Sequence, residues 1–293
     1  MLDLSRIDFM RRGAFGRMLK TERRMRQRTT TGARVVCVAS GKGGTGKSIL
    51  ASNLASRRAE RGERVLLVDF DAGLANAHLL LGLSPTYDLG HVAAGTVRLD
   101  EALVEGPHGL FLLSGGVGRP ALADPGRRDL DRLFRALRPA EDDFDLIVVD
   151  HGAGMGFGTV AHLAATSTLI LVTSHEVTGL SDAYALYKRA ITVNPTIRVG
   201  MVVNRAPDEP TATAAWTRFR EACQRFLRTQ PEWIGFVPAD PAVARSVEYR
   251  VPVTTSAPDS AAARAFERVS SWPPLDLART SSAFYERALR ALR

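Results

Sequence analysis

The stretch ASGKGGTGKS, residues 39–48, decides the fold because of what lies on either side of it. The run RVVCVAS, residues 34–40, is short and apolar enough for a buried strand, and SILASNLASRRA, residues 48–59, has the apolar spacing of a helix. Glycines between a strand and a helix let consecutive backbone N–H groups point at one anion, and the helix dipole attracts the same anion. The sequence therefore predicts a phosphate-binding loop.

Roles within this loop follow from its residue types. Lys47 would reach the β- and γ-phosphates of a nucleotide, and the Ser48 hydroxyl would hold Mg²⁺. The predicted nucleotide-binding residues of the loop are Gly41, Lys42, Gly43, Gly44, Thr45, Gly46, Lys47, Ser48 and Ile49. This geometry does not need Lys42, which requires a separate explanation. The alternative for the whole stretch is a glycine-rich turn that binds no ligand.

The composition is that of a large globular chain. Its 293 residues are 45% hydrophobic and 24% charged, which is enough for the core of one large α/β domain or of two smaller ones. The two cysteines, Cys37 and Cys223, provide no disulfide framework and no metal-ligand spacing, which suits a reducing cytoplasm. No run of 18 apolar residues occurs, and no apolar segment of signal-peptide length follows the basic N-terminus. We expect neither export nor a membrane span.

The net charge of +8 is concentrated at the two ends of the chain. Residues 1–34 carry +7 and residues 279–293 carry +3, so the body between them is about −2. Both ends also contain apolar residues, which is typical of basic amphipathic segments that bind a membrane surface or a partner. We therefore divide the chain into a leader at 1–34, a P-loop domain at 35–278 and a tail at 279–293.

Each end has more than one interpretation. In the tail, a helix would place Tyr285, Ala288, Leu289 and Leu292 on one face, with Glu286, Arg290 and Arg293 opposite. Such a helix either binds an anionic membrane surface or docks on the body of the protein. For the leader, disorder, docking of a partner and binding to a phosphate backbone all remain open.

Short apolar runs alternate with helical patterns along the body. These runs are continuous rather than alternating, which indicates strands of a parallel sheet covered on both faces. They lie at 34–40, 64–70, 109–115, 144–150, 167–174, 197–204 and 233–239. Helical spacing occurs at 48–62, 127–138, 181–191 and 213–229, where the last places Trp216, Phe219, Cys223 and Phe226 on one face. The sequence thus predicts one α/β domain, a mostly parallel twisted sheet of about seven or eight strands with helices on both faces.

Polar side chains lie where three of the predicted strands end. Asp69 and Asp71 end the second strand, Asp150 ends the fourth and Asn204 ends the sixth. Ligands of open α/β sheets bind at this edge, and phosphoryl transfer needs groups that hold Mg²⁺ and orient the attacking water. The amide of Asn204 can both donate to and accept from the edge of adenine. As alternatives, Asp71 is a helix N-cap and Asn204 is a turn residue.

The loop GKGGTGKS resembles the deviant Walker A motif, KGGxGK[ST], of the MinD/ParA family in the SIMIBI class of P-loop NTPases. In that family the first lysine crosses the interface of an ATP-bound homodimer and contacts the phosphates held by the partner subunit. The resemblance therefore gives Lys42 a role that its own subunit does not require. It implies that hydrolysis of ATP to ADP and phosphate depends on dimerisation, because a charge supplied by the partner is present only in the dimer.

The same resemblance assigns the remaining site residues. The implied catalytic residues are Lys42, Lys47 and Asp71, of which Asp71 would position or polarise the water. The implied Mg²⁺ residues are Ser48, Asp69 and Asp150, of which Asp150 matches the Walker B aspartate. The implied adenine contacts are Asn204, Pro238 and Asp240, which together indicate ATP.

Four further sequence segments between residues 71 and 275 resemble FlhG, also called FleN. Proteins of this branch of the family control the number and placement of bacterial flagella. The four segments are DAGLANAHLLLGL, DHGAGMG, SDAYALYKRA and SSWPPL. This branch implies a nucleotide-dependent dimerising switch in the cytoplasm or peripherally at the inner face of the cell membrane. The implied partners are an FlhF-like GTPase, a flagellar basal-body or regulatory protein, and an anionic membrane surface bound by the tail.

Some features depart from this pattern and keep alternatives open. His151 stands where relatives usually carry a small hydroxyl residue, SHEVTGL at 174–180 replaces a proline-containing turn, and the leader has no clear DQAxxLR motif for an FlhF-like partner. A ParA-like partitioning ATPase that binds non-specific DNA and a MinD-type division-site regulator are the alternatives. A metal-cluster-inserting relative would need cysteine ligands near the dimer axis, which Cys37 and Cys223 do not provide.

Overall fold

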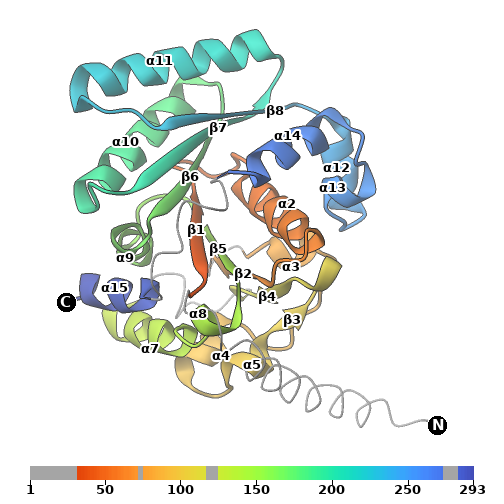
Figure 1. Cartoon of the computed structure of the whole chain (residues 1–293), viewed down its shortest axis with the longest axis vertical. Helices are drawn as coiled ribbons and strands as arrows, with labels where there is room; N and C mark the ends of the chain where they lie inside the picture. The colour runs from red at the N-terminus through yellow and green to blue at the C-terminus, as the bar shows by residue number, and fades with distance from the viewer. Residues whose placement is uncertain (1–31, 72–74, 117–124, 273–282) are drawn as a thin grey trace.

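The computed structural model describes residues 32–71, 75–116, 125–272 and 283–293. Its strands are β1 (Arg34–Ala39), β2 (Val65–Phe70), β3 (Val104–Glu105), β4 (Phe111–Leu113), β5 (Leu146–His151), β6 (Thr168–Thr173), β7 (Arg198–Ala206) and β8 (Glu232–Pro238). They form one 8-stranded sheet in the order β3-β4-β2-β5-β1-β6-β7-β8 (Figure 1). Every neighbouring pair is parallel except β3 with β4. The leader predicted at 1–34 lies almost entirely outside the described residues.

All of the apolar runs predicted as strands are strands, so the predicted α/β sheet is confirmed. The central strands β5 and β6 are buried at every position, which explains why their sequences are continuously apolar. Strand β3 was not predicted as a separate run, because its 2 residues are too few to show any periodicity.

Helices cover both faces of the sheet, as predicted (Figure 1). On one face a core lies under α2 (Lys47–Glu60), α13 (Val253–Ser256) and α14 (Ala261–Ser270). On the other face a second core lies under α7 (Arg127–Leu137), α9 (Phe157–Ala165), α10 (Val177–Val193) and α11 (Glu209–Leu227). Shorter elements are α3 (Ala77–Leu80), α4 (Leu89–Ala94), α5 (Leu99–Ala102), η1 (Pro107–Gly109), α8 (Ala140–Asp143) and α12 (Pro241–Glu248).

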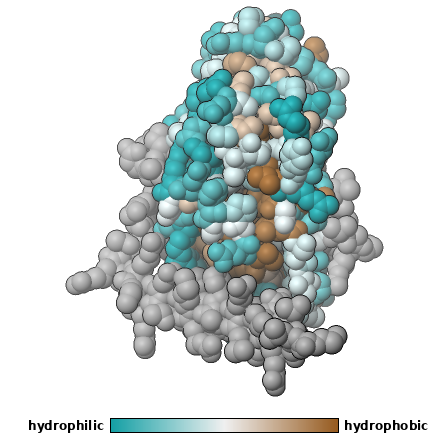
Figure 2. Space-filling view, turned by 90° about the vertical axis from the view of Figure 1, so that its right-hand side faces the viewer, coloured by the Kyte–Doolittle hydropathy of each residue, from teal (hydrophilic) through white to brown (hydrophobic). Residues whose placement is uncertain are grey.

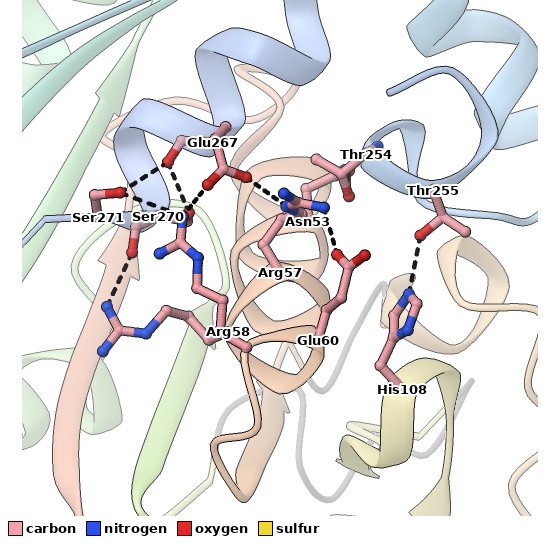
Figure 3. A network of polar contacts seen from close by, with 11 residues as sticks. Asn53, Arg57, Arg58, Glu60, His108, Thr254, Thr255, Glu267, Ser270 and Ser271 are labelled. Carbon is pink, nitrogen blue, oxygen red and sulfur yellow. Dashed lines mark hydrogen bonds and ion pairs between the residues drawn. The ribbon is translucent and has the colours of Figure 1, made fainter. Parts of the chain in front are cut away.

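A polar network fastens α2, the helix that follows the glycine-rich loop, to α13 and α14 (Figure 3). The Asn53 side-chain oxygen accepts hydrogen bonds from both the backbone N–H and the hydroxyl of Thr254, each at 3.1 Å. Arg58 donates to the backbone oxygen of Ser270 at 2.9 Å, and Arg57 pairs with Glu267. These contacts involve the middle and the last turn of α2, so they hold the helix against α13 and α14.

Helix α11 corrects one detail of the predicted apolar face. Phe219 and Cys223 are buried and Trp216 is half-buried, but Phe226 is 66% exposed. The Phe226 ring lies against the guanidinium of Arg225, 5.2 Å from the ring centroid, instead of joining the core. The apolar face of the last turn is therefore completed by Leu227, which packs against the core in place of Phe226.

The C-terminal helix α15 (Phe284–Ala291) is docked on the body of the protein against α7 and α9. Its buried side chains are Phe284, Tyr285, Ala288 and Leu292, and Leu289 is partly buried. The buried carboxylate of Glu141 accepts the backbone N–H groups of Phe284 at 3.0 Å and Tyr285 at 2.8 Å. Of the two interpretations of the tail, the structure shows the docked helix.

Figure 2 shows the face at the right of Figure 1, where hydrophilic side chains dominate and apolar side chains gather in a narrow band. Large apolar side chains that are exposed among the described residues include Met155, Phe157 and Val177. Among the described helices, none has both the length and the apolar character needed to cross a membrane.

Candidate functional site

The glycine-rich loop forms the turn between β1 and α2 at the carboxyl edge of the sheet. Gly44 and Gly46 have φ values of 74° and 83°, which glycine adopts without strain. Gly46 precedes α2, and no described side chain caps this helix, so its first N–H groups can bind a ligand. Gly41 lies against α10, where an added Cβ would be 2.2 Å from the carbonyl oxygen of Asp182. This loop has the shape and the free donors that a phosphate group requires.

Lys47 lies between two carboxylates at this edge. Its Nζ is 3.5 Å from Oδ2 of Asp71 and 3.7 Å from Oδ1 of Asp150. It also donates to the Ser48 hydroxyl at 3.4 Å, and its side chain is 10% exposed. The structure thus brings together four of the residues that the sequence predicts for the site. Because both carboxylates can attract the ammonium, a bound phosphate would compete with them for Lys47.

Asp69 and Asp150 lie side by side on β2 and β5, in register and fully buried. Burial, together with the charge of the neighbouring Asp150, raises the pKa of Asp69 to about 7. Burial also raises the pKa of Asp150 to about 6, although the ammonium of Lys47 opposes the rise. Two buried carboxylates of this kind are costly unless a cation or hydrogen bonds compensate them.

The two carboxylates differ in how they are compensated. Asp69 accepts hydrogen bonds from the backbone N–H of Ala77 at 3.0 Å and of Asp71 at 3.2 Å. The oxygens of Asp150 accept no well-formed hydrogen bond from the described residues, and only the nearby Lys47 and Ser48 side chains favour its charge. Carboxylate and hydroxyl oxygens are ligands that Mg²⁺ prefers, so Asp150 together with Ser48 fits this ion. Both carboxylate oxygens of Asp69 already accept backbone hydrogen bonds. Its predicted role in binding Mg²⁺ stays a prediction.

Lys42, the second lysine of the loop, lies apart from this group. Its side chain is 46% exposed, and its Nζ is 3.8 Å from Glu176 and 3.3 Å from the hydroxyl of Thr178. Neither of these partners was predicted, and the only signal in the sequence was that SHEVTGL departs from the pattern of relatives. The structure places Lys42 where it is accessible from outside the subunit.

The predicted adenine contacts lie at the ends of β7 and β8. The Asn204 amide donates to the Thr45 carbonyl oxygen at 2.7 Å, so it faces the loop. Asp240 accepts the backbone N–H of Ala242 at 2.8 Å and of Ala262 at 3.0 Å, at the starts of α12 and α14. Pro238 ends β8 beside Asp240. Their contact with adenine stays a prediction.

Sequence reasoning missed a buried group of rings behind Asp150. The ring centroid of His151 is 4.9 Å from that of His162 on α9 and 5.7 Å from that of Phe70. Burial lowers the pKa of His151 to about 3, with a smaller contribution from Lys47, and burial lowers the pKa of His162 well below its usual value. Phe70 stands between Asp69 and Asp71, so these rings hold the strand end that carries both aspartates.

The comparison with known proteins identifies the family. Residues 36–253 match the family described as the CobQ/CobB/MinD/ParA nucleotide binding domain. The chain therefore belongs to the MinD/ParA family of nucleotide-binding ATPases, which confirms the resemblance found in the loop and the aspartate motifs.

Two relatives and one solved structure show which members of the family the chain is similar to. The chain is 32% identical to the antiactivator FleN of Pseudomonas aeruginosa over 243 residues, 82% of this chain and 87% of that protein. It is 28% identical over 237 residues to the flagellum site-determining protein YlxH of Helicobacter pylori, covering 80% of each. Among solved structures, the septum site-determining protein MinD of Pyrococcus horikoshii, complexed with Mg-ADP, gives a TM-score of 0.68 at 25% identity and covers 82% of this chain and 95% of MinD. The fold is therefore that of a MinD-like P-loop protein.

Proposed function

We propose that this chain binds ATP with Mg²⁺ in the loop of residues 41–48 and hydrolyses it slowly as a homodimer. The supporting observation is the separation of the two loop lysines. Lys47 lies between Asp71 and Asp150 at the sheet edge, whereas the Lys42 side chain is 46% exposed. One lysine then serves the nucleotide of its own subunit, and the other reaches the nucleotide of a second copy.

The roles of the remaining residues follow from this arrangement. When bound, Mg²⁺ neutralises the charge that develops on the phosphate oxygens. The Ser48 hydroxyl and the Asp150 carboxylate hold it, and Lys47 leaves its two carboxylate partners for the β- and γ-phosphates. The Asp71 carboxylate, 24% exposed at the mouth of the site, orients the attacking water. Asn204, Pro238 and Asp240 line the place of the adenine.

We propose that the cellular role is control of the number and placement of flagella. Support comes from two relatives named for this process, FleN of Pseudomonas aeruginosa and YlxH of Helicobacter pylori. An FlhF-like GTPase or a flagellar regulatory protein would then be the partner of the ATP-bound dimer. Counting flagella in a strain without FleN, with and without this chain, tests the assignment, and an unchanged count contradicts it.

Membrane binding by the tail is part of the same proposal. The apolar face of α15 is buried on the body, so it would have to leave that position before it could bind an anionic surface. Co-sedimentation with anionic liposomes, with and without residues 281–293, tests this step. A ParA-like role would instead appear as DNA binding that weakens steeply with salt.

The experiment that tests the proposed ATPase compares Lys42→Ala with the native chain. We expect Lys42→Ala to bind ATP with native affinity and to lose the turnover that rises with protein concentration. Lys188→Ala, at an exposed position on α10, serves as the control for removal of a positive charge. Hydrolysis by Lys42→Ala at the native rate would exclude a lysine acting from the partner subunit.

A further inference from the structure

The end of β7 is irregular at the point where it meets the glycine-rich loop. Asn204 pairs with Val237 and Ala206 pairs with Pro238, which leaves Arg205 as an extra residue in β7. Arg205 also has a φ of 57°, a left-handed value that is strained for a residue with a side chain. A bulge of this kind redirects the neighbouring side chains of its strand, and bulges are common next to active sites.

The bulge directs the Asn204 side chain at the backbone of the loop. Asn204 is buried, and its Nδ2 donates to the carbonyl oxygen of Thr45 at 2.7 Å. Its Oδ1 accepts the backbone N–H of Arg205 at 3.0 Å, so the bulge itself fixes the orientation of the amide. The approach is close, because a Cβ added to Gly46 would lie 2.2 Å from Nδ2. Arg205 extends the same contact, with its Nη1 at 3.5 Å from the carbonyl oxygen of Gly44.

Holding a carbonyl group also orients the N–H group of the same peptide unit. In a trans peptide the C=O and the N–H point in opposite directions. With the Thr45 oxygen held by Asn204, the N–H of Gly46 points away from Asn204, and that N–H belongs to the loop that donates to phosphate. The Ser40 hydroxyl holds the Lys42 carbonyl at 2.8 Å in the same way, so two peptide units of the loop are held from outside.

We propose that Asn204 is a positioning residue of the phosphate-binding loop, which it holds in its binding shape whether or not a base is present. This inference rests on the proposed binding of a nucleoside triphosphate and goes beyond the contact with adenine predicted for Asn204. The two roles are compatible, because the amide still has one N–H and one lone pair for a base. They differ in one consequence: a residue that only reads adenine does not affect a ligand without a base, whereas a residue that shapes the loop does.

The test uses the full-length chain and inorganic tripolyphosphate with Mg²⁺ as the base-free probe. Its affinity is read by competition with a fluorescent ATP analogue, and hydrogen exchange of the amides of residues 41–48 is read without any ligand. Asn204→Ala removes the amide, and Asn204→Leu removes both of its hydrogen bonds while it keeps most of the side-chain volume and adds no charge near the phosphates. The matched control is Asn194→Ala, because the Asn194 amide donates to the carbonyl oxygen of Thr166 at 2.7 Å, next to the start of β6 and far from the loop.

We expect both Asn204 variants to lose about tenfold or more in affinity for tripolyphosphate as well as for ATP, because each loses the donor to Thr45 and the acceptor for Arg205. Hydrogen exchange of the loop amides should be faster than in the native chain in both Asn204 variants. In Asn194→Ala it should proceed at the native rate. If Asn204→Ala has a lower affinity for ATP but binds tripolyphosphate with native affinity, then Asn204 contacts only the base. In that case the inference is wrong. Native exchange of the loop amides in Asn204→Ala would overturn it as well. If the native chain binds neither ligand, the proposed nucleotide binding fails, and the inference fails with it.

Discussion

The ammonium of Lys47 lies 3.7 Å from Oδ1 of Asp150, a fully buried carboxylate whose charge is favoured chiefly by Lys47 and Ser48. Asp150 therefore depends on Lys47 for compensation of its charge in a poorly solvated place, whereas Lys47 also has Asp71 at 3.5 Å. Under the proposed function, nucleotide binding would separate Lys47 from Asp150, because Lys47 would contact the phosphates while Asp150 and Ser48 would hold Mg²⁺. The predictions below start from this pair.

Replacing Lys47 by Met should abolish ATP binding and make stability depend more strongly on pH. Without the ammonium, the already raised pKa of Asp150 rises further. The folded state then binds more protons than the unfolded state, so the free energy of unfolding falls as the pH rises through that interval. We expect thermal unfolding of Lys47→Met to approach that of the native chain near pH 5 and to fall clearly below it at pH 8. Equal differences at both pH values would contradict the pairing of Lys47 with Asp150.

A methyl group at Gly41 should disturb the loop. The Cβ of Gly41→Ala would lie 2.2 Å from the Asp182 carbonyl oxygen, which is backbone of α10 and cannot move aside. We expect a large loss of thermal stability, of about 2 kcal/mol or more as for other overpacked sites. Gly43→Ala is the matched control, because the nearest heavy atom to its Cβ is 4.0 Å away. Similar melting temperatures for the two variants would show that α10 does not hold the loop.

The buried His162 should make the protein sensitive to acid. Burial lowers its pKa well below the usual value, whereas in the unfolded chain it takes up a proton near pH 6.5. Because the unfolded state binds more protons below that pH, stability falls as the pH drops, by about 1.4 kcal/mol per pH unit for one proton. His162→Phe removes this contribution and keeps an aromatic ring in the group. Urea unfolding at pH 7, 6 and 5 should give a shallower decline for the variant, and parallel declines would refute the buried neutral state.

The Glu141 carboxylate should be needed for docking of α15. It accepts the first two backbone N–H groups of the helix, from Phe284 and Tyr285. We expect Glu141→Ala to increase hydrogen exchange across α15 and to lower global stability by about 1–3 kcal/mol, the cost of buried donors without a partner. The neighbouring exposed Asp142 provides the control variant Asp142→Ala. Native exchange of α15 in Glu141→Ala would mean that the apolar face alone holds the helix.

Features set by local sequence were predictable. The continuous apolar runs located every long strand, because a strand covered on both faces needs apolar residues at each position. Glycines 44 and 46 marked the loop, because left-handed φ values at consecutive turns favour glycine. Asp69, Asp71 and Asp150 could be placed at one edge because the carboxyl ends of parallel strands meet there.

Features set by distant partners were not predictable. Asn204 and Thr45 are 159 positions apart, and nothing in either segment indicates that the amide of one binds the carbonyl of the other. Docking of α15 depends likewise on Glu141, more than 140 positions earlier. The amphipathic pattern of the tail indicated that one face would be covered, but a membrane and a protein surface select the same pattern.

The central claim is that ATP and Mg²⁺ convert the chain from a monomer to a homodimer in which Lys42 acts on the partner's nucleotide. Light scattering during size-exclusion chromatography tests it directly on Asp71→Ala, a variant expected to bind ATP without hydrolysing it. We predict a monomer with ADP and a dimer with ATP and Mg²⁺. A monomer under both conditions, with ATP demonstrably bound, would contradict the claim.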